Sequence, residues 1–325
     1  MLHQLRPLRK IVTKKPFPWQ DFLAPRFWPS WLGLAGMRLL VVLPYRLQLF
    51  IGKIIGHLFY LIAHYRREIA QTNIALCFPE LSAEQQKKLV KEHFHSVGMS
   101  IPETALSWWG SNKQLQKLLH IEGLEHLQTE LEKGHGAILL GAHYTTLEIS
   151  GGLLSLLQTT AVTYQDLRNP LFNQVMISSR KKKFEPVISR HNIRSMIKAL
   201  KNNKVVWFAT DQDSGIKNSL FVPFFGQLAA TQTAPSRIAK ITKSPVLPFI
   251  SRRLDNAQGY QITILAALEN FPGDNIEQDI IRVSQLIETQ VRKAPEQYLW
   301  IHRRFKTRPE GMPKLYRKKP RRVKK

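Results

Sequence analysis

A histidine and a glutamate stand five residues apart, at His143 and Glu148, directly after a short apolar run. The run, residues 136–142, is bounded by glycines and is typical of a buried parallel strand. Residues five apart on a regular helix point about 140° away from each other, so the two side chains can meet only if His143 lies in a turn before the helix. A carboxylate on one imidazole nitrogen leaves the other free to take a proton from a hydroxyl group. The pattern therefore predicts His143 as a general base oriented by Glu148.

The His143–Glu148 spacing is weak by itself, because a surface histidine near a helix acid gives the same pattern. Metal binding is the next alternative, but no second histidine at ligand spacing and no cysteine-rich motif accompanies the pair, so no metal is expected. A serine hydrolase would need a Gly-x-Ser-x-Gly turn, and Ser150 lies past the expected helix start in the wrong frame. The position of His143 after a predicted strand favours a general base, and a surface histidine near a helix acid stays open as the alternative.

Two acids, Asp211 and Asp213, follow the strand-like run at residues 205–209. Acids at a strand end can orient a basic or hydroxyl-bearing partner, although a solvated turn explains them equally well. The next stretch, residues 220–226, is apolar and either packs as core or lines an apolar groove. We expect Asp211 and Asp213 to shape the substrate side of the site.

Arginines interleaved with aromatic residues form a third cluster near the end of the chain, at residues 298–309. Arg303, Arg304 and Arg308 suit phosphate contacts, because a guanidinium group offers a planar fork of donors. A basic helix end or a nucleic-acid patch would look similar. The sequence contains no recognised nucleic-acid module, so we expect no nucleic acid as a partner.

The elements that must position these residues alternate between strands and helices. This alternation indicates an α/β fold with a largely parallel central sheet flanked by helices. Strands are predicted at residues 136–142, 160–164, 205–209, 245–250 and 260–265, and helices at 147–157, 170–183, 193–202, 233–241 and 276–292. A further helix is expected to begin after Ser82, with Gln85 completing the cap.

Length and composition indicate one main domain in a chain of 325 residues. The formal charge of +25 favours polyanionic partners such as phosphate-bearing lipid, nucleic acid or an acidic carrier protein. Both chain ends are basic, and two solvated tails would explain them as well. The single cysteine, Cys77, lies in an apolar run, where a buried small hydrophobic residue is expected rather than a nucleophile.

A mostly apolar stretch at residues 31–43 is too short to span a membrane and contains Arg38. Joining it to the apolar residues 47–63 would bury further cations in hydrocarbon, so the pair is expected to lie at the membrane interface. Tryptophans and arginines on its flanks suit a headgroup boundary with anionic lipid. A pair of core helices that cap the domain is the alternative. Basic flanks on both sides place both termini in the cytoplasm.

Taken in order, these clusters resemble the late acyltransferases of lipid A biosynthesis, a family of lauroyl, palmitoleoyl and myristoyl transferases. The resemblance covers nearly the whole chain and is far more specific than any one motif. It rests on residues 25–28, 73–80, 143–148, 169–171, 211–215, 221–226 and 295–311.

The resemblance implies a glycerolipid-acyltransferase-like fold and a His143–Glu148 catalytic pair, with no cofactor. It implies an acyl carrier protein as donor and a Kdo-bearing lipid A precursor as acceptor, at the cytoplasmic face of the inner membrane. Gln165 departs from the arginine that the family would have after Tyr164, so an acceptor-phosphate role at this place is expected only if Arg168 substitutes. The tail after Tyr316 is additional.

We therefore expect an O-acyltransferase that works as a monomer. In it, His143 takes the proton of a hydroxyl on an acyl chain of the acceptor, which attacks the carrier thioester. The expected organisation is a basic arm with an interfacial anchor (1–67), a catalytic domain (68–316) and a basic tail (317–325). The competing hypothesis is a basic membrane- or nucleic-acid-binding protein without catalysis.

Overall fold

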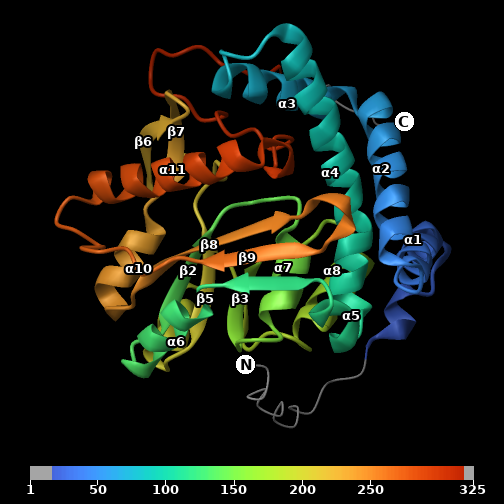
Figure 1. Ribbon diagram of the computed structural model, residues 1–325, viewed down its shortest axis with the longest axis horizontal. Helices are drawn as coiled ribbons and strands as arrows, with labels where there is room; N and C mark the ends of the chain where they lie inside the picture. The colour runs from blue at the N-terminus through green and yellow to red at the C-terminus, as the bar shows by residue number, and fades with distance from the viewer. Residues whose placement is uncertain (1–16, 318–325) are drawn as a thin grey trace.

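A seven-stranded sheet forms the centre of the protein in a computed structural model that describes residues 17–317 (Figure 1). The strand order is β1-β9-β8-β2-β5-β3-β4, and β6 and β7 form a separate antiparallel hairpin. The basic arm before residue 17 and the tail after residue 317, both singled out in the sequence, lie outside the described residues. The strands are β1 (Leu119–Glu122), β2 (Ala137–Gly141), β3 (Thr160–Tyr164), β4 (Val187–Ser189), β5 (Val205–Ala209), β6 (Ser219–Phe224), β7 (Gln227–Gln232), β8 (Val246–Arg253) and β9 (Tyr260–Ile264).

The predicted α/β architecture is confirmed, because helices cover both faces of the sheet. Successive residues of β2 face opposite cores: Ile138 and Leu140 pack into one, Ala137 and Leu139 into the other. The α-helices are α1 (Trp28–Leu40), α2 (Tyr45–Ile62), α3 (His64–Cys77), α4 (Ala83–Trp109), α5 (Asn112–Gln116), α6 (Leu124–Glu132), α7 (Leu147–Leu154), α8 (Pro170–Arg180), α9 (Ile193–Lys201), α10 (Ala234–Thr242) and α11 (Ile276–Lys293). The short 3₁₀ helices are η1 (Trp19–Phe22), η2 (Pro25–Phe27), η3 (Asp255–Ala257) and η4 (Pro295–Gln297).

The sheet is parallel except at one edge, where β9 runs antiparallel to β8. The five predicted strands appear as β2, β3, β5, β8 and β9, with β8 extending to Arg253. The short strands β1 and β4 and the β6–β7 hairpin were not predicted. Residues 220–226 lie mainly in that hairpin, where Val222, Phe224 and Phe225 are buried. This stretch therefore packs as core.

The long helix α4 begins with the predicted cap. Ser82 accepts the N–H of Gln85, whose side chain accepts the N–H of Ser82 in return. The helix lies beside α2, as Figure 1 shows at its right-hand edge. Their backbones touch, because a Cβ atom added at Gly98 would lie 2.1 Å from the carbonyl oxygen of Gly52. Helix α2 is thus packed tightly against α4, and the boundary expected after residue 67 falls inside α3.

The N-terminal helices carry most of the large exposed apolar side chains. These are Trp19, Leu23, Trp28, Leu32, Leu39, Val42, Leu47, Phe50, Ile54, Leu58, Leu61 and Ile62. We call this set the apolar face. Between residues 17 and 317, no single helix is long and apolar enough to cross a membrane. Helices α2 and α3 together have the length and apolar character to do so, but they are bent by 95° where they meet.

The C-terminal segment after α11 crosses the carboxyl ends of the strands and ties them to α3. Asn73 of α3, fully buried, donates to the carbonyls of Trp300 and His302 and accepts the hydroxyl of Tyr316. The N–H of Leu299 donates to the carbonyl of His143 at 3.0 Å. The segment therefore forms part of the surroundings of the histidine singled out in the sequence.

Candidate active site

His143 lies in the turn between β2 and α7, as its position after the apolar run predicted. Its ring nitrogen Nδ1 is 2.7 Å from Oδ1 of Asp211, and its backbone N–H donates to Oδ2 of the same residue at 2.9 Å. The register explains this pairing. Gly141 of β2 lies opposite Ala209 of the neighbouring parallel strand β5, so His143 and Asp211 each stand two residues beyond paired positions.

The His143–Asp211 pair combines a buried acid with a partly exposed ring. Asp211 is 2% exposed, whereas 23% of the His143 side chain remains accessible. Burial raises the pKa of Asp211, but the charge and the two hydrogen bonds of His143 outweigh it and lower this pKa to about 2. An acid that stays ionised places the imidazole proton on Nδ1. Nε2, which has no hydrogen-bond partner within residues 17–317, is then able to accept a proton.

Among residues 17–317, Glu148 makes no hydrogen bond to the imidazole, which corrects the orientation role expected from the sequence. Its carboxylate receives two hydrogen bonds from the Arg180 guanidinium of α8 and one from the indole N–H of Trp108 at 2.7 Å. Burial raises the pKa of Glu148, but Arg180 outweighs it and holds this pKa below its usual value. Glu148 lies in the first turn of α7 and projects toward α8, whereas Asp211 reaches the ring from the adjacent strand.

An apolar cavity lies between α7, α8 and the neighbouring strands. Its walls include Leu154, Val162, Phe184, Trp207 and Phe249. The Glu148–Arg180 ion pair and two threonines, Thr160 and Thr163, form the polar part of the lining. The Trp207 ring also meets the His143 ring edge-to-face, with 6.0 Å between centroids. The cavity and the imidazole thus share one wall.

Asp213, in the loop after β5, is hydrogen-bonded to the C-terminal segment near the His143–Asp211 pair. Its carboxylate accepts the backbone N–H of Thr307 at 2.6 Å and the Thr307 hydroxyl at 2.8 Å. Its own N–H donates to Nε2 of His302 at 3.2 Å. Burial lowers the pKa of His302 to about 4, so this ring is neutral and acts as an acceptor. Asp213 therefore holds the C-terminal segment beside the turn that carries His143.

The arginines expected to bind phosphate have different surroundings. Arg304 is 2% exposed, and its guanidinium donates to the carbonyl of Ala230 and the hydroxyl of Thr231 at 2.7 Å each. It lies over the Phe224 ring and belongs to the core, which corrects its expected role at a phosphate. Arg308 is partly exposed and donates to the carbonyl of Leu228 and to Met312.

Arg303 and Arg168 are more accessible. Arg303 is partly exposed and Arg168 is exposed. Within residues 17–317, neither guanidinium has a protein hydrogen-bond partner, so both could bind an anionic substrate. The lone Cys77 is buried, and burial raises the pKa of its thiol, which supports the structural role expected for it.

Sequence reasoning missed several residues that build the site. Arg180, which neutralises Glu148, stands 32 positions away from it, and Trp108 stands 40 away. No local pattern connects such positions, so only the fold reveals them. The sequence did contain a sign of the role of Asp211. Asp211 lies two residues after the end of β5, just as His143 lies two residues after the end of β2.

The sequence is similar to known proteins along nearly its whole length. Residues 15–307 match the family described as bacterial lipid A biosynthesis acyltransferase. The chain is 37% identical to the lipid A biosynthesis palmitoleoyltransferase of Escherichia coli K12 over 298 residues, which covers 91% of this chain and 97% of that protein. It is 35% identical to the lauroyltransferase of the same strain over 90% of this chain and 96% of that protein. The myristoyltransferase of that strain is 26% identical over 92% and 94%.

Proposed function

Because this chain belongs to the bacterial lipid A biosynthesis acyltransferases, we propose that it transfers a fatty acyl group from acyl carrier protein to a hydroxyl on an acyl chain of a Kdo-bearing lipid A precursor. The observation that carries the proposal is the His143 ring, held at Nδ1 by Asp211 with Nε2 left open. This arrangement suits the removal of a proton from a neutral hydroxyl group.

In the proposed reaction, Nε2 of His143 takes the hydroxyl proton of the acceptor as its oxygen attacks the thioester carbon. Asp211 stabilises the imidazolium that forms. The new carbon–oxygen bond then replaces the carbon–sulfur bond, and the imidazolium gives its proton to the departing carrier thiolate, which leaves as the free thiol. No acyl-enzyme intermediate is needed, and no cofactor takes part.

The apolar cavity beside His143 would hold acyl chain, because its walls are aliphatic and aromatic. Glu148 would act in catalysis through Arg180 rather than through the imidazole. Their ion pair places a guanidinium group in the cavity wall, and the carboxylate keeps that buried charge paired. Asp213 would keep the C-terminal segment on the acceptor side.

The charge of the chain, +25, supports both proposed substrates, since the carrier protein is acidic and lipid A carries phosphate. Arg168, Arg303 and Arg308 are the candidates for acceptor phosphates among the residues named from the sequence. We assign Arg303 and Arg168 first, because their guanidinium groups have no protein partner within residues 17–317. We propose that the protein acts as a monomer.

We also propose attachment to the cytoplasmic face of the inner membrane through the apolar face. Helix α2 buries Leu49, Gly52 and Gly56 against α4, yet its opposite side also presents apolar residues. A helix that is apolar on both sides needs a second apolar partner. Arg46 and Lys53 on the same helix line an open groove and could contact anionic lipid headgroups, although three acids also line it.

Replacing Phe50 and Leu58 together by serine should reduce binding to anionic phospholipid vesicles by at least about tenfold. Each exposed apolar side chain contributes roughly 1.5–3 kcal/mol when it is fully buried, and these two are 59% and 53% exposed. Vesicle co-sedimentation measures the effect. The matched control replaces Ile216 and Ile241, exposed isoleucines outside the apolar face, by serine. Equal binding by both double variants would contradict the proposal.

The donor is tested by supplying the purified protein with the same acyl group on acyl carrier protein or on coenzyme A, together with the acceptor. We expect the carrier-protein thioester to give the higher kcat/KM, with a steep decrease as salt is raised, because charge complementarity accelerates the encounter. Equal kcat/KM for both donors at low salt would reject the carrier protein as the specific donor.

A further inference from the structure

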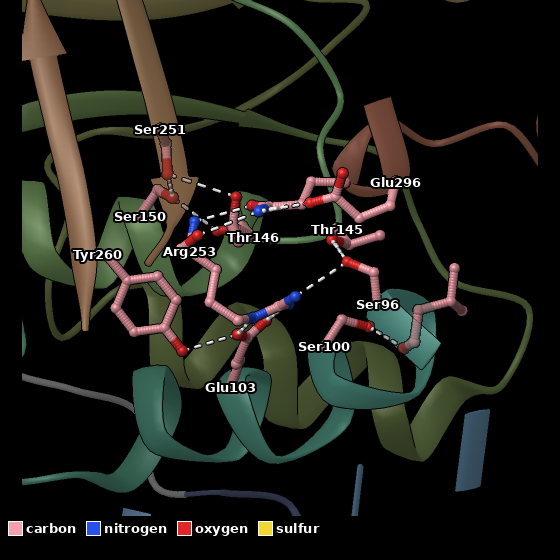
Figure 2. A network of polar contacts seen from close by, with 12 residues as sticks. Ser96, Ser100, Glu103, Thr145, Thr146, Ser150, Ser251, Arg253, Tyr260 and Glu296 are labelled. Carbon is pink, nitrogen blue, oxygen red and sulfur yellow. Dashed lines mark hydrogen bonds and ion pairs between the residues drawn. The ribbon is translucent and has the colours of Figure 1, made fainter. Parts of the chain in front are cut away.

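A chain of buried polar groups connects α4 to the turn that carries His143, as Figure 2 shows. The guanidinium of Arg253, at the end of β8, binds both carboxylate oxygens of Glu103 on α4. Its remaining amino group donates to Oγ of Ser96 at 2.9 Å. Oγ of Ser96 also shares a 2.7 Å hydrogen bond with Oγ1 of Thr145, two residues after His143. All four linked side chains are buried.

The same arginine reaches the turn by a second route, through its backbone. The side-chain amide of Gln297 accepts the N–H of Arg253 at 2.8 Å and donates to its carbonyl at 3.1 Å. The carbonyl of Gln297 accepts the N–H of Thr145 at 2.8 Å. Thr145 is therefore fixed at its side chain and at its backbone by groups that Arg253 holds in place.

Both carboxylate oxygens of Glu103 in this ion pair accept hydrogen bonds. The hydroxyl of Tyr260 donates to Oε1 of Glu103 at 2.7 Å, beside the guanidinium fork. A buried ion pair is weak evidence for stability, because loss of hydration offsets much of the attraction. Its directional geometry, in contrast, fixes where the remaining amino group of Arg253 points as a donor. That donor points to Ser96 and so toward the catalytic turn.

We propose that Arg253 is a positioning residue, which acts through Ser96 and Thr145 to hold the His143 turn in register with Asp211. It reaches neither the imidazole nor the cavity beside it. The inference rests on the proposed function, in which His143 is the general base. The inference adds residues of α4 and β8 to those that position this base.

Ser96→Ala and Thr145→Val test the link without removing a charge. We expect each to lower kcat about tenfold and to leave KM for donor and acceptor nearly unchanged, because a displaced base affects the transition state more than binding. The double variant should lose no more than either single one, since both break the same link. Thr145→Ser keeps the hydroxyl and should retain kcat near that of the unchanged protein.

Ser100→Ala is the matched control. Ser100 lies one turn further along α4, and its hydroxyl donates only to the carbonyl of Val97, at 2.6 Å. Its kcat should be unchanged. The inference is overturned if Ser96→Ala and Thr145→Val keep kcat within twofold of this control, or if their losses follow raised KM or unfolding at the assay temperature. His143→Ala in the same assay separates the two hypotheses: an active His143→Ala protein rejects the proposed base itself.

Discussion

Replacing His143 by alanine should lower the rate of acyl transfer by about 10²–10⁴, the usual contribution of a general base. The variant lacks the imidazole ring, so no Nε2 atom is present to take the proton of the acceptor hydroxyl. Steady-state transfer with purified protein measures the loss. The fold should persist, because the imidazole is partly exposed and the backbone bonds of residue 143 to Asp211 and Leu299 do not depend on its side chain.

The control for this variant is its thermal unfolding and its binding to vesicles, both of which should match those of the unchanged protein. Binding should match because the apolar face is contributed by separate N-terminal elements. If a folded His143→Ala protein kept more than a tenth of the activity, His143 would not be the base.

Asp211→Asn should be at least as damaging, with kcat lowered by about 10⁴, the loss seen when an amide replaces the acid of a catalytic triad. An amide N–H that faces Nδ1 drives the imidazole proton onto Nε2, the nitrogen that must accept the acceptor's proton. Glu148→Gln should affect activity by a different route, because it weakens the partner of a buried Arg180.

Nitrogen NMR of the His143 ring separates these two acids. With ¹⁵N-labelled histidine, and His143→Ala to assign the signal, Asp211→Asn should change the tautomer while Glu148→Gln leaves it unchanged. A tautomer change in Glu148→Gln alone would restore the orientation role that the sequence suggested for Glu148.

The strands that position the site could be predicted because each is a short apolar run, and β3 and β5 were predicted with their observed bounds. Their order in the sheet could not be read in the same way. The partner of His143 depends on that order, since Asp211 reaches the ring only because β5 lies beside β2. Proximity in sequence favoured Glu148, whereas proximity across the sheet selected Asp211.

The burial of charged side chains was the feature that could least be predicted from the sequence. Arg304 belongs to a basic, aromatic segment whose sequence suggests a phosphate-binding site. Its guanidinium instead donates a hydrogen bond to a backbone carbonyl of β7. Arg253 and Glu103 are 150 positions apart and have no local signature. Arginines in similar sequence surroundings can thus be buried or exposed, and only the tertiary contacts decide which.

The mass of lipid A in cells that lack this protein tests the central claim most directly. The account predicts lipid A that is short of one acyl chain, with full acylation restored by the unchanged protein and not by His143→Ala expressed at the same level. Unaltered lipid A in the deficient cells, or restoration by the His143→Ala protein, would contradict it.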